Sequence, residues 1–195
     1  ERVVMASTGS VYMPVWRVPI DERHPASGNS HYAFSKLWGE RMTLLYRTPF
    51  VVLRYAHIYG AKRWKDGLIN AFIDRVRRGM QPILYGGQQS NDFTYVKDIA
   101  RANVLALETP HLNEVYNIGT GNEITSKDAS LMVAHAIHYE GKIDVQARRD
   151  IDPPRFVYDI DKARRLLGYE PKWAFEAGLE DMLRDRAKDD EEASL

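Results

Sequence analysis

Two short continuous apolar runs, within residues 2–6 and 50–53, constrain the fold more than any other feature of the chain. Runs without polar alternation are typical of strands buried on both faces of a parallel sheet. Between them, residues 31–47 carry apolar side chains at helical spacing. These positions are Phe34, Leu37, Trp38, Met42 and Leu45, and Tyr32 and Lys36 fall on a different face. The strand, helix, strand order predicts a β-α-β unit and therefore an α/β fold.

Beyond about residue 66 the pattern changes to short helices and strands. Helical periodicity predicts helices at residues 67–78, 96–107, 127–138, 162–167 and 175–183. Short strands are predicted at residues 82–85, 115–118 and 143–147. Asp98 and Ser126 are the predicted N-caps of the helices that follow them. The acidic tail, residues 188–195, is predicted to be disordered.

Composition excludes several classes of function. The chain has 195 residues with 44% hydrophobic content, enough for a sizeable core, and a net charge of zero, so we expect no nucleic-acid partner. No apolar run approaches the roughly 20 residues of a membrane span and no signal peptide is visible, so we expect no membrane partner and a cytoplasmic protein. Without cysteine, and with no acid-rich spacing around the histidines, no metal site is predicted.

Tyr32 and Lys36 lie four residues apart, a spacing that puts both side chains on one face of a helix. A phenol with an ordinary pKa of about 10 needs a nearby positive charge to accept a proton near neutrality, and Lys36 can supply it. Thr8 adds a hydroxyl that can hold the reacting oxygen. Considered without their surroundings, Tyr32 and Lys36 could also be an exposed pair on a helix, and Thr8 could simply end a strand.

Five segments, in order along the chain, match the motifs of one family. They are Thr8-Gly-Ser-Val-Tyr12, Tyr32 to Lys36, Arg54-Tyr-Ala-His-Ile-Tyr-Gly60, Asp92-Phe-Thr-Tyr-Val-Lys-Asp98 and Asp159-Ile-Asp-Lys-Ala-Arg-Arg-Leu-Leu-Gly-Tyr169. On these motifs the chain resembles the extended short-chain dehydrogenase/reductase family. Within it, the chain is similar to the NAD-dependent nucleotide-sugar epimerases and dehydratases, in particular the UDP-glucose/UDP-galactose 4-epimerase-like proteins. The resemblance covers nearly the whole chain.

The resemblance implies a fold and a division of labour. Residues 1–65 would form the C-terminal part of a Rossmann-like parallel sheet that binds NAD, with NADP not excluded. Residues 66–187 would form a small α+β domain that mainly binds the nucleotide-sugar substrate. The implied cofactor-binding residues are Thr8, Tyr32, Lys36, Tyr55 and Ala56. The implied substrate-binding residues are Thr8, His57, Ile83, Leu84, Tyr85, Asn91, Arg149 and Asp152.

The implied chemistry is a transient oxidation of the sugar by three catalytic residues, Thr8, Tyr32 and Lys36. As a phenolate, Tyr32 would take a proton from a sugar hydroxyl while hydride passes to NAD. Thr8 would orient that oxygen, and Lys36 would hold the nicotinamide ribose and lower the pKa of Tyr32. In an epimerase the keto-sugar then takes the hydride back on its other face.

Several positions depart from the family pattern. Gly9 and Ser10 stand where dehydratases and decarboxylases place acids, which favours epimerisation or simple reduction. Asn91 replaces an arginine that grips the diphosphate, and His57 replaces an asparagine that contacts the substrate. Arg149 matches the second phosphate-binding arginine, but it reads equally well as a solvated charge. We therefore expect a nucleotide-sugar-shaped site with altered affinity or an unusual substrate.

No glycine-rich turn of the kind that binds a pyrophosphate opens the chain. Gly119-Thr-Gly121 comes late and lacks the third glycine of that fingerprint, so we predict a tight turn between a strand and a helix there. We therefore expect the C-terminal portion of a longer protein. Missing strands would leave the strand at residues 3–5 with an open edge, which predicts a homodimer or a partner segment supplying the missing N-terminal strands.

Three functions stay open at this point. The first is the NAD-dependent nucleotide-sugar epimerase. The second is an NAD(P)-dependent reductase of a keto-sugar or small carbonyl on the same fold. The third is a non-catalytic module, or a split half that works only beside a partner chain.

Overall fold

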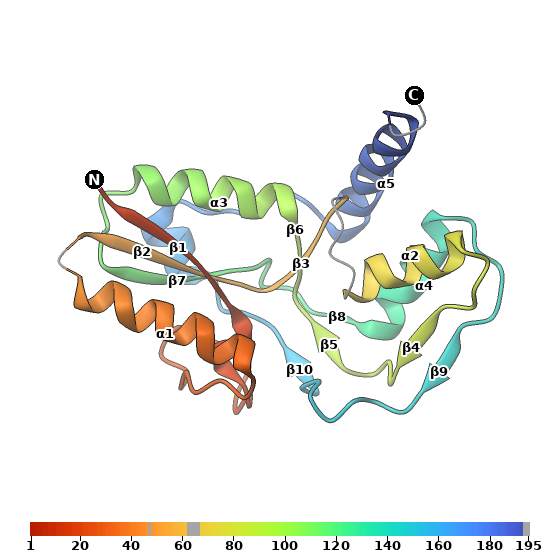
Figure 1. The fold of residues 1–195 in the computed structure, drawn as a ribbon, viewed down its shortest axis with the longest axis horizontal. Coiled ribbons are helices and arrows are strands. Elements are labelled where there is room, and N and C mark those ends of the chain that lie inside the picture. The colour runs from red at the N-terminus through yellow and green to blue at the C-terminus, as the bar shows by residue number, and fades with distance from the viewer. Residues whose placement is uncertain (47, 62–66, 193–195) are drawn as a thin grey trace.

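The structure is a computed structural model that describes residues 1–46, 48–61 and 67–192. It has two parts, with the N-terminus in the first and the C-terminus at the far end of the second (Figure 1). The first part is a parallel sheet in the order β1 (Val3–Thr8), β2 (Phe50–Tyr55) and β7 (Glu114–Ile118). The expected α/β fold with a Rossmann-like parallel sheet is confirmed.

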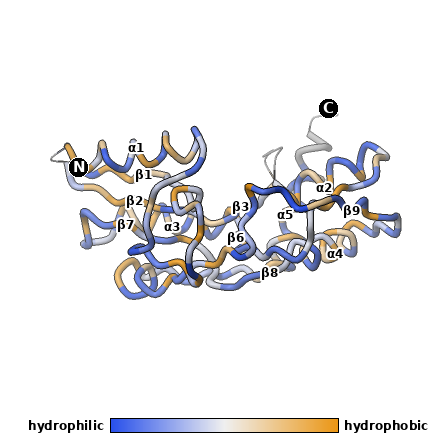
Figure 2. The backbone as a smooth tube through the Cα atoms, turned by 90° about the horizontal axis from the view of Figure 1, so that it is seen from below, coloured by the Kyte–Doolittle hydropathy of each residue, from blue (hydrophilic) through white to orange (hydrophobic). Residues whose placement is uncertain are grey.

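Helices cover both faces of this sheet. Helix α1 (His31–Leu45) packs on one face, and α3 (Val96–Glu108) lies on the other with the short π-helix η2 (Ala163–Leu167) beside it (Figure 1). Hydrophobic stretches run along β1 and β2 (Figure 2). The core between the layers includes Val51, Leu53, Ala102, Ala106, Tyr116 and Ile118, all fully buried. The apolar run of β2 therefore forms a strand buried on both faces, as predicted. The run of β1 does not, because most of that strand is exposed or only partly buried, with Val3 43% exposed.

The second part packs helices against short strand pairs. Its helices are α2 (Leu68–Arg77), α4 (Ser126–Ala136) and α5 (Phe175–Glu192). Its strands pair as β3 (His57–Tyr59) with β6 (Phe93–Tyr95), β4 (Ile83–Tyr85) with β9 (Asp144–Gln146), and β5 (Ser90–Asn91) with both β8 (Ile124–Thr125) and β10 (Arg155–Phe156). A second core of Tyr59, Phe72, Ile73, Val133, Leu179 and Met182 holds these elements together.

The chain crosses between the two parts more than once. Because β7 pairs with β2 and α3 packs on the same sheet, residues 96–118 belong spatially to the first part. The expected division at residues 65 and 66 therefore does not coincide with the spatial division. Strand β1 is an edge strand, since β2 is its only strand neighbour within the described residues. What covers that edge stays a prediction.

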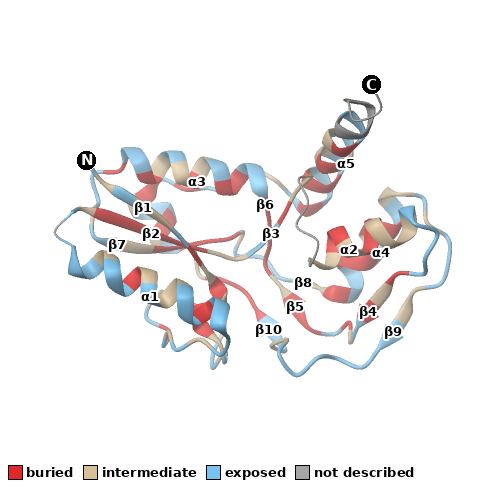
Figure 3. Ribbon diagram, viewed as in Figure 1, coloured by how far each residue is buried: buried red, intermediate tan, exposed pale blue. Residues whose placement is uncertain are grey.

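Helix α1 contradicts the predicted packing face. Phe34, Trp38, Met42 and Leu45 are 41–75% exposed, whereas Ala33 and Glu40 are buried. Most of the helix is pale blue, the colour of exposed residues, in Figure 3. The physical reason lies in how closely the helix approaches the sheet. A Cβ on Gly39 would stand 2.3 Å from the Met5 methyl carbon, so small residues face β1 and the large apolar ones face outward.

Three smaller predictions were also wrong. Asp98 does not cap α3; its buried carboxylate accepts the backbone N–H groups of Lys172 and Trp173 instead. Thr125, not Ser126, caps α4, because the Thr125 side chain accepts from the Asp128 N–H. In the tail, α5 continues through Glu192, and residues 188–192 contain neither glycine nor proline. Residues 193–195 of that tail lie outside the described residues.

The turn at residues 119–121 leads from β7 into the short strand β8, and α4 begins only after β8. The expected turn from a strand into a helix is therefore corrected to a turn between two strands. Asp92, fully buried, organises it. Its carboxylate accepts the N–H and hydroxyl of Thr120, the Gly121 N–H and, at 3.5 Å, the Tyr158 N–H. One carboxylate therefore joins the turn to the segment after β10.

Candidate active site

A cavity of about 1020 Å³ opens between the two parts, at the carboxyl ends of β1 and β2. Ligands of α/β sheets bind at such strand ends. All but one of the residues predicted for the site line it. They are Thr8, Tyr32, Lys36, Tyr55, Ala56, His57, Ile83, Tyr85, Asn91, Arg149 and Asp152. The sequence motifs thus come together in one place although they are far apart in the chain.

Leu84 is the residue that does not line the cavity. Its side chain is 3% exposed and belongs to the interior, while its neighbours Ile83 and Tyr85 border the cavity. Side chains alternate between the two faces of a strand, so three consecutive residues of β4 cannot all face one ligand. The assignment of Leu84 as a substrate contact is therefore withdrawn.

Tyr32 and Lys36 both project from the first turns of α1. The helix starts there because the Ser30 side chain accepts the Ala33 N–H, as an N-cap does. The Lys36 ammonium donates to the Ala6 carbonyl of β1 at 3.1 Å and lies 6.0 Å from the centre of the Tyr32 ring. The phenol itself is half exposed and borders the cavity. The cation is thus fixed beside the phenol at the end of β1.

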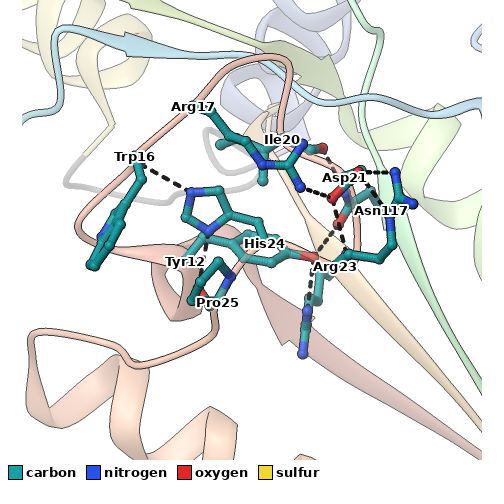
Figure 4. Close-up of polar contacts among 10 residues, drawn as sticks. Tyr12, Trp16, Arg17, Ile20, Asp21, Arg23, His24, Pro25 and Asn117 are labelled. Carbon is teal, nitrogen blue, oxygen red and sulfur yellow. Dashed lines mark hydrogen bonds and ion pairs between the residues drawn. The ribbon is translucent and has the colours of Figure 1, made fainter.

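The segment between η1 (Gly9–Tyr12), a 3-10 helix, and α1 fixes where α1 begins. Figure 4 shows the buried ring of His24 at its centre, accepting from the Trp16 N–H and donating to the Pro25 carbonyl. Asn117 of β7 donates to the Ile20 carbonyl and ties the segment to the sheet. His24 is therefore a packing residue, consistent with the sequence interpretation.

Thr8 ends β1, and Gly9 follows it in a crowded position. The Thr8 hydroxyl oxygen accepts the Ser10 N–H at 3.3 Å. A Cβ on Gly9 would lie 2.3 Å from Cζ of Phe156 and 2.6 Å from the Tyr158 hydroxyl, so no side chain fits there without movement. The rings of Phe156 and Tyr158 therefore leave no room for an acidic side chain at position 9.

Replacing Gly9 by alanine is expected to lower the free energy of unfolding by about 1–3 kcal/mol, the usual cost of overpacking a core. Urea denaturation measures it. Because Phe156 is the obstacle, Phe156→Leu in the same molecule should recover part of the loss relative to Phe156→Leu alone. A Gly9→Ala protein as stable as the wild type would contradict the crowding.

On the wall of the cavity formed by the second part, Arg149 is paired with a nearby carboxylate. Arg149 donates two hydrogen bonds to the Asp152 carboxylate, at 2.9 and 3.0 Å, and its guanidinium lies 5.3 Å from the centre of the Tyr85 ring. The hydrogen bond with Asp152 raises the pKa of Arg149 above its ordinary value. Asn91 donates to the Ser126 hydroxyl at 3.4 Å. A phosphate bound here has to share Arg149 with Asp152.

Tyr55 and Ala56 line the cavity next to the Tyr32 side. The Tyr55 hydroxyl donates to the side chain of Asn103 on α3, so its polar end is already engaged. The Ala56 N–H donates to the Ile118 carbonyl and holds the end of β2 beside β7. Both residues therefore shape the cavity with their backbone more than with a free polar group.

His57 is exposed towards the cavity, which it lines, and its ring lies edge-on to Phe93 and Phe156. Desolvation lowers the pKa of His57 to about 4, and the nearby charge of Asp152 opposes this only partly. The imidazole is therefore neutral at physiological pH and can both donate and accept a hydrogen bond.

The lowered pKa of His57 makes stability depend on pH. Because desolvation lowers the pKa of His57 in the folded chain, stability should fall as the pH drops below about 6.5, and only modestly because the ring is exposed to the cavity. Urea unfolding of the wild type and of His57→Asn between pH 4 and 7 tests it. The variant should lose less stability on acidification, and parallel curves would contradict the assignment.

Sequence reasoning missed a buried polar cluster behind the cavity. Glu40 of α1 and Arg54 of β2 form an ion pair with both side chains under 10% exposed. Ser7 donates to the same carboxylate, and Arg54 donates to the Tyr12 hydroxyl. The only indication in the sequence was Glu40, one helical turn after Lys36, and a single glutamate on a helix normally predicts a solvated side chain.

No described helix is long and apolar enough to cross a membrane. Within residues 1–46, 48–61 and 67–192, no group of three acidic or histidine side chains is arranged to hold a metal ion.

Comparison with known proteins identifies the family to which the chain belongs. A family model described as GDP-mannose 4,6 dehydratase matches residues 1–182. A protein of Methanocaldococcus jannaschii named "Putative UDP-glucose 4-epimerase" is 35% identical over 188 residues, which are 92% of this chain and 61% of that protein. The chain thus spans about three fifths of the length of this relative.

Solved structures agree with the sequence comparison. The UDP-glucose 4-epimerase of Thermotoga maritima, solved with UDP-glucose, has a TM-score of 0.90 and 30% identity, covering 96% of this chain and 64% of that one. The UDP-glucuronic acid 4-epimerase of Bacillus cereus, solved with UDP-glucuronic acid and NAD, has a TM-score of 0.87 and 28% identity, covering 97% and 62%. With a family model matched over nearly its whole length, the chain belongs to the extended short-chain dehydrogenase/reductase family of NAD-dependent nucleotide-sugar epimerases and dehydratases.

Proposed function

We propose that this chain is the catalytic and substrate-binding portion of an NAD-dependent nucleotide-sugar epimerase, in which Tyr32 is the base. The observation that carries the proposal is the meeting of Thr8, Tyr32 and Lys36 in one large cavity. In this proposal the sheet of the first part presents the catalytic residues and the cofactor. The second part receives the nucleotide end of the substrate.

The residues at the sheet end fit a nicotinamide ribose. An ammonium has three N–H donors, and Lys36 spends one on the Ala6 carbonyl, which leaves donors for ribose hydroxyls. Tyr32, Lys36 and Thr8 border open space of ligand size. When bound, NAD supplies a reversible hydride acceptor. Lys36, Tyr32, Thr8, Tyr55 and Ala56 are the residues that would hold it.

The chain's own residues then handle the proton. The Tyr32 phenolate, favoured by the cation of Lys36, accepts the proton from the sugar hydroxyl, and the resulting phenol returns it when the keto-sugar is reduced. The Thr8 hydroxyl orients the sugar oxygen towards the phenol. Because Lys36 is fixed by β1, these groups meet the substrate in a constant geometry.

The surroundings of Thr8 favour epimerisation over dehydration. Dehydration needs an additional acid and base beside the sugar, and Gly9 and Ser10 provide no carboxylate. The Phe156 ring also fills the space that a side chain on Gly9 needs. The relatives include both epimerases and dehydratases, and this local feature supports epimerisation in the proposal.

On the substrate side, we propose that Arg149, Asp152, Asn91 and His57 face the nucleotide diphosphate and the sugar. The Arg149–Asp152 pair lies on the wall of the cavity beside Tyr85. Since Asn91 carries no charge, a diphosphate gains fewer ionic contacts here than with two arginines.

The test uses the complete polypeptide that contains these residues, mixed with NAD and a panel of nucleotide sugars. Chromatography of the products and absorbance at 340 nm are followed together. An epimerase interconverts two sugars without net formation of reduced cofactor. Stoichiometric consumption of cofactor would instead identify the reductase alternative. Failure of every sugar and carbonyl tried, with cofactor bound, would favour the non-catalytic module.

A further inference from the structure

Helix α1 carries three ionisable side chains spaced four residues apart, Tyr32, Lys36 and Glu40. Lys36 is therefore one helical turn from a phenol on one side and from a carboxylate on the other. Lysine and glutamate at this spacing commonly form an ion pair on helices. Such a pair would compensate the ammonium charge and weaken its effect on the phenol.

In the structure Glu40 has other partners. Arg54 donates to both of its carboxylate oxygens, from Nε at 3.0 Å and from Nη2 at 2.6 Å. The Ser7 hydroxyl donates to the same carboxylate. Both side chains of the ion pair are almost fully buried, at 8% and 6% exposure. The charge of Glu40 is therefore compensated from β2 and not from its own helix.

Lys36 has a different partner on β1. Its ammonium donates to the Ala6 carbonyl, the residue before Ser7, and no ion pair of Lys36 is found among the residues the structure describes. Two consecutive residues of β1, Ala6 and Ser7, thus form separate hydrogen bonds with Lys36 and Glu40. The ammonium stays near the Tyr32 ring, 6.0 Å from its centre.

Arg54 is itself held in place by Tyr12. Its Nη1 donates to the Tyr12 hydroxyl at 2.8 Å, and that hydroxyl donates to Asn117 at 2.7 Å. Burial raises the pKa of Tyr12 to about 12, so the phenol keeps its proton. Burial alone would lower the pKa of Arg54, but its contacts with Glu40 and Tyr12 raise it above the ordinary value. Arg54 is therefore a permanent cation.

The elements packed against α1 are β1 and η1, and the titratable groups at this contact are Tyr12 from η1 and Arg54 from β2. The remaining ionisable side chains near Tyr32 belong to the cavity wall, among them Tyr55, His57, Arg149 and Asp152. Within the part of the chain that the structure describes, none of these four side chains forms a hydrogen bond or ion pair with Glu40.

We propose that Arg54 is a positioning residue for the reaction: by holding the carboxylate of Glu40, it reserves the ammonium of Lys36 for Tyr32. The role rests on the proposed function, in which Lys36 favours the Tyr32 phenolate. It concerns a residue of the Arg54 to Gly60 motif that has no direct contact with the reacting atoms.

The test is the pH–rate profile of epimerisation in the complete polypeptide for three variants. In Arg54→Met, Glu40 is free to pair with Lys36, so the acid limb should move up by roughly one pH unit and the rate at pH 7 should fall about tenfold. Arg54→Lys keeps a cation and should keep the limb. The double variant Glu40→Met with Arg54→Met removes the competing carboxylate, so it should return the limb to the wild-type pH and recover most of the rate.

A limb that shifts in Arg54→Met and returns in the double variant is the result that a merely structural ion pair does not produce, because a loss of stability alone does not move the limb. A wild-type limb in Arg54→Met, or no recovery in the double variant, overturns the role of Arg54. If Arg54→Met does not fold, the double variant decides alone, because buried ion pairs are generally replaceable by apolar residues of similar size. A wild-type limb then supports the proposal, and a shifted limb or a more than tenfold lower rate overturns it.

Arg186 offers a matched control. Its side chain is as buried as that of Arg54, it forms an ion pair with the partly exposed Asp74 at 3.0 Å, and it does not line the cavity. Arg186→Met should lose stability without moving the limb, and a shift as large as that of Arg54→Met would overturn the specific role of Arg54. Tyr32→Phe separates the two proposals. If it abolishes turnover while the Arg54 variants behave like wild type, only the role of Arg54 fails.

Discussion

Replacement of Tyr32 by phenylalanine is expected to lower the rate of epimerisation by about 10³-fold, within the range attributed to positioned general acid–base groups. The change removes one oxygen and leaves the ring. Because the phenol is half exposed to the cavity and is not part of the core, the fold should persist. Cofactor affinity should change little, since Lys36 and the strand ends remain. The measurement is kcat with a saturating nucleotide sugar, beside a titration of NAD.

Tyr46 provides a control on the same helix. It is the C-cap residue of α1, is 65% exposed and does not line the cavity. Tyr46→Phe should have the wild-type rate. If Tyr32→Phe retained more than a tenth of the wild-type rate, Tyr32 would not be the base.

Replacement of Asp92 by alanine is expected to lower the free energy of unfolding by about 3–5 kcal/mol. The carboxylate is fully buried and accepts from Thr120, Gly121 and Tyr158. Each buried donor left without a partner costs roughly 1–3 kcal/mol. Because Asp92 joins the turn after β7 to the segment after β10, both parts of the molecule should lose stability in one transition. Urea denaturation followed by circular dichroism measures the loss.

Two further variants serve as controls for the Asp92→Ala result. Asp92→Asn keeps one acceptor oxygen and should lose less than alanine does. Asp161→Ala removes an exposed carboxylate whose ion pair with Arg164 is long, at 3.5 Å, and should change stability by less than about 0.5 kcal/mol. Equal stability of Asp92→Ala and Asp161→Ala would show that the buried carboxylate does not organise the turn.

The sequence predicted the site better than the packing around it. Tyr32 and Lys36 are four residues apart on a helix, so their common face follows from geometry alone. The strand of residues 50–53 was recognisable because double burial leaves a continuous apolar run. The observed helix, His31–Leu45, closely matches the predicted helix at residues 31–47, because apolar residues recur there at helical spacing.

The face that α1 buries could not be predicted, because periodicity identifies an apolar row but not what covers it. Close contact with β1 requires Ala33 and Gly39, which carry no apolar signal. The ion pair of Glu40 and Arg54 was hidden for a related reason. A single sequence reads charged residues as solvated, and only the register of β2 against α1 shows that these two meet in the interior.

The most direct test of the account follows the hydrogen on the carbon whose configuration changes. The complete polypeptide is incubated with a nucleotide sugar deuterated at that carbon, in ordinary water, and the products are analysed by mass spectrometry. A transient keto-sugar that recovers its own hydride predicts that both epimers retain the deuterium fully. Deuterium exchanged for solvent hydrogen, or trapped in released reduced cofactor, would contradict it.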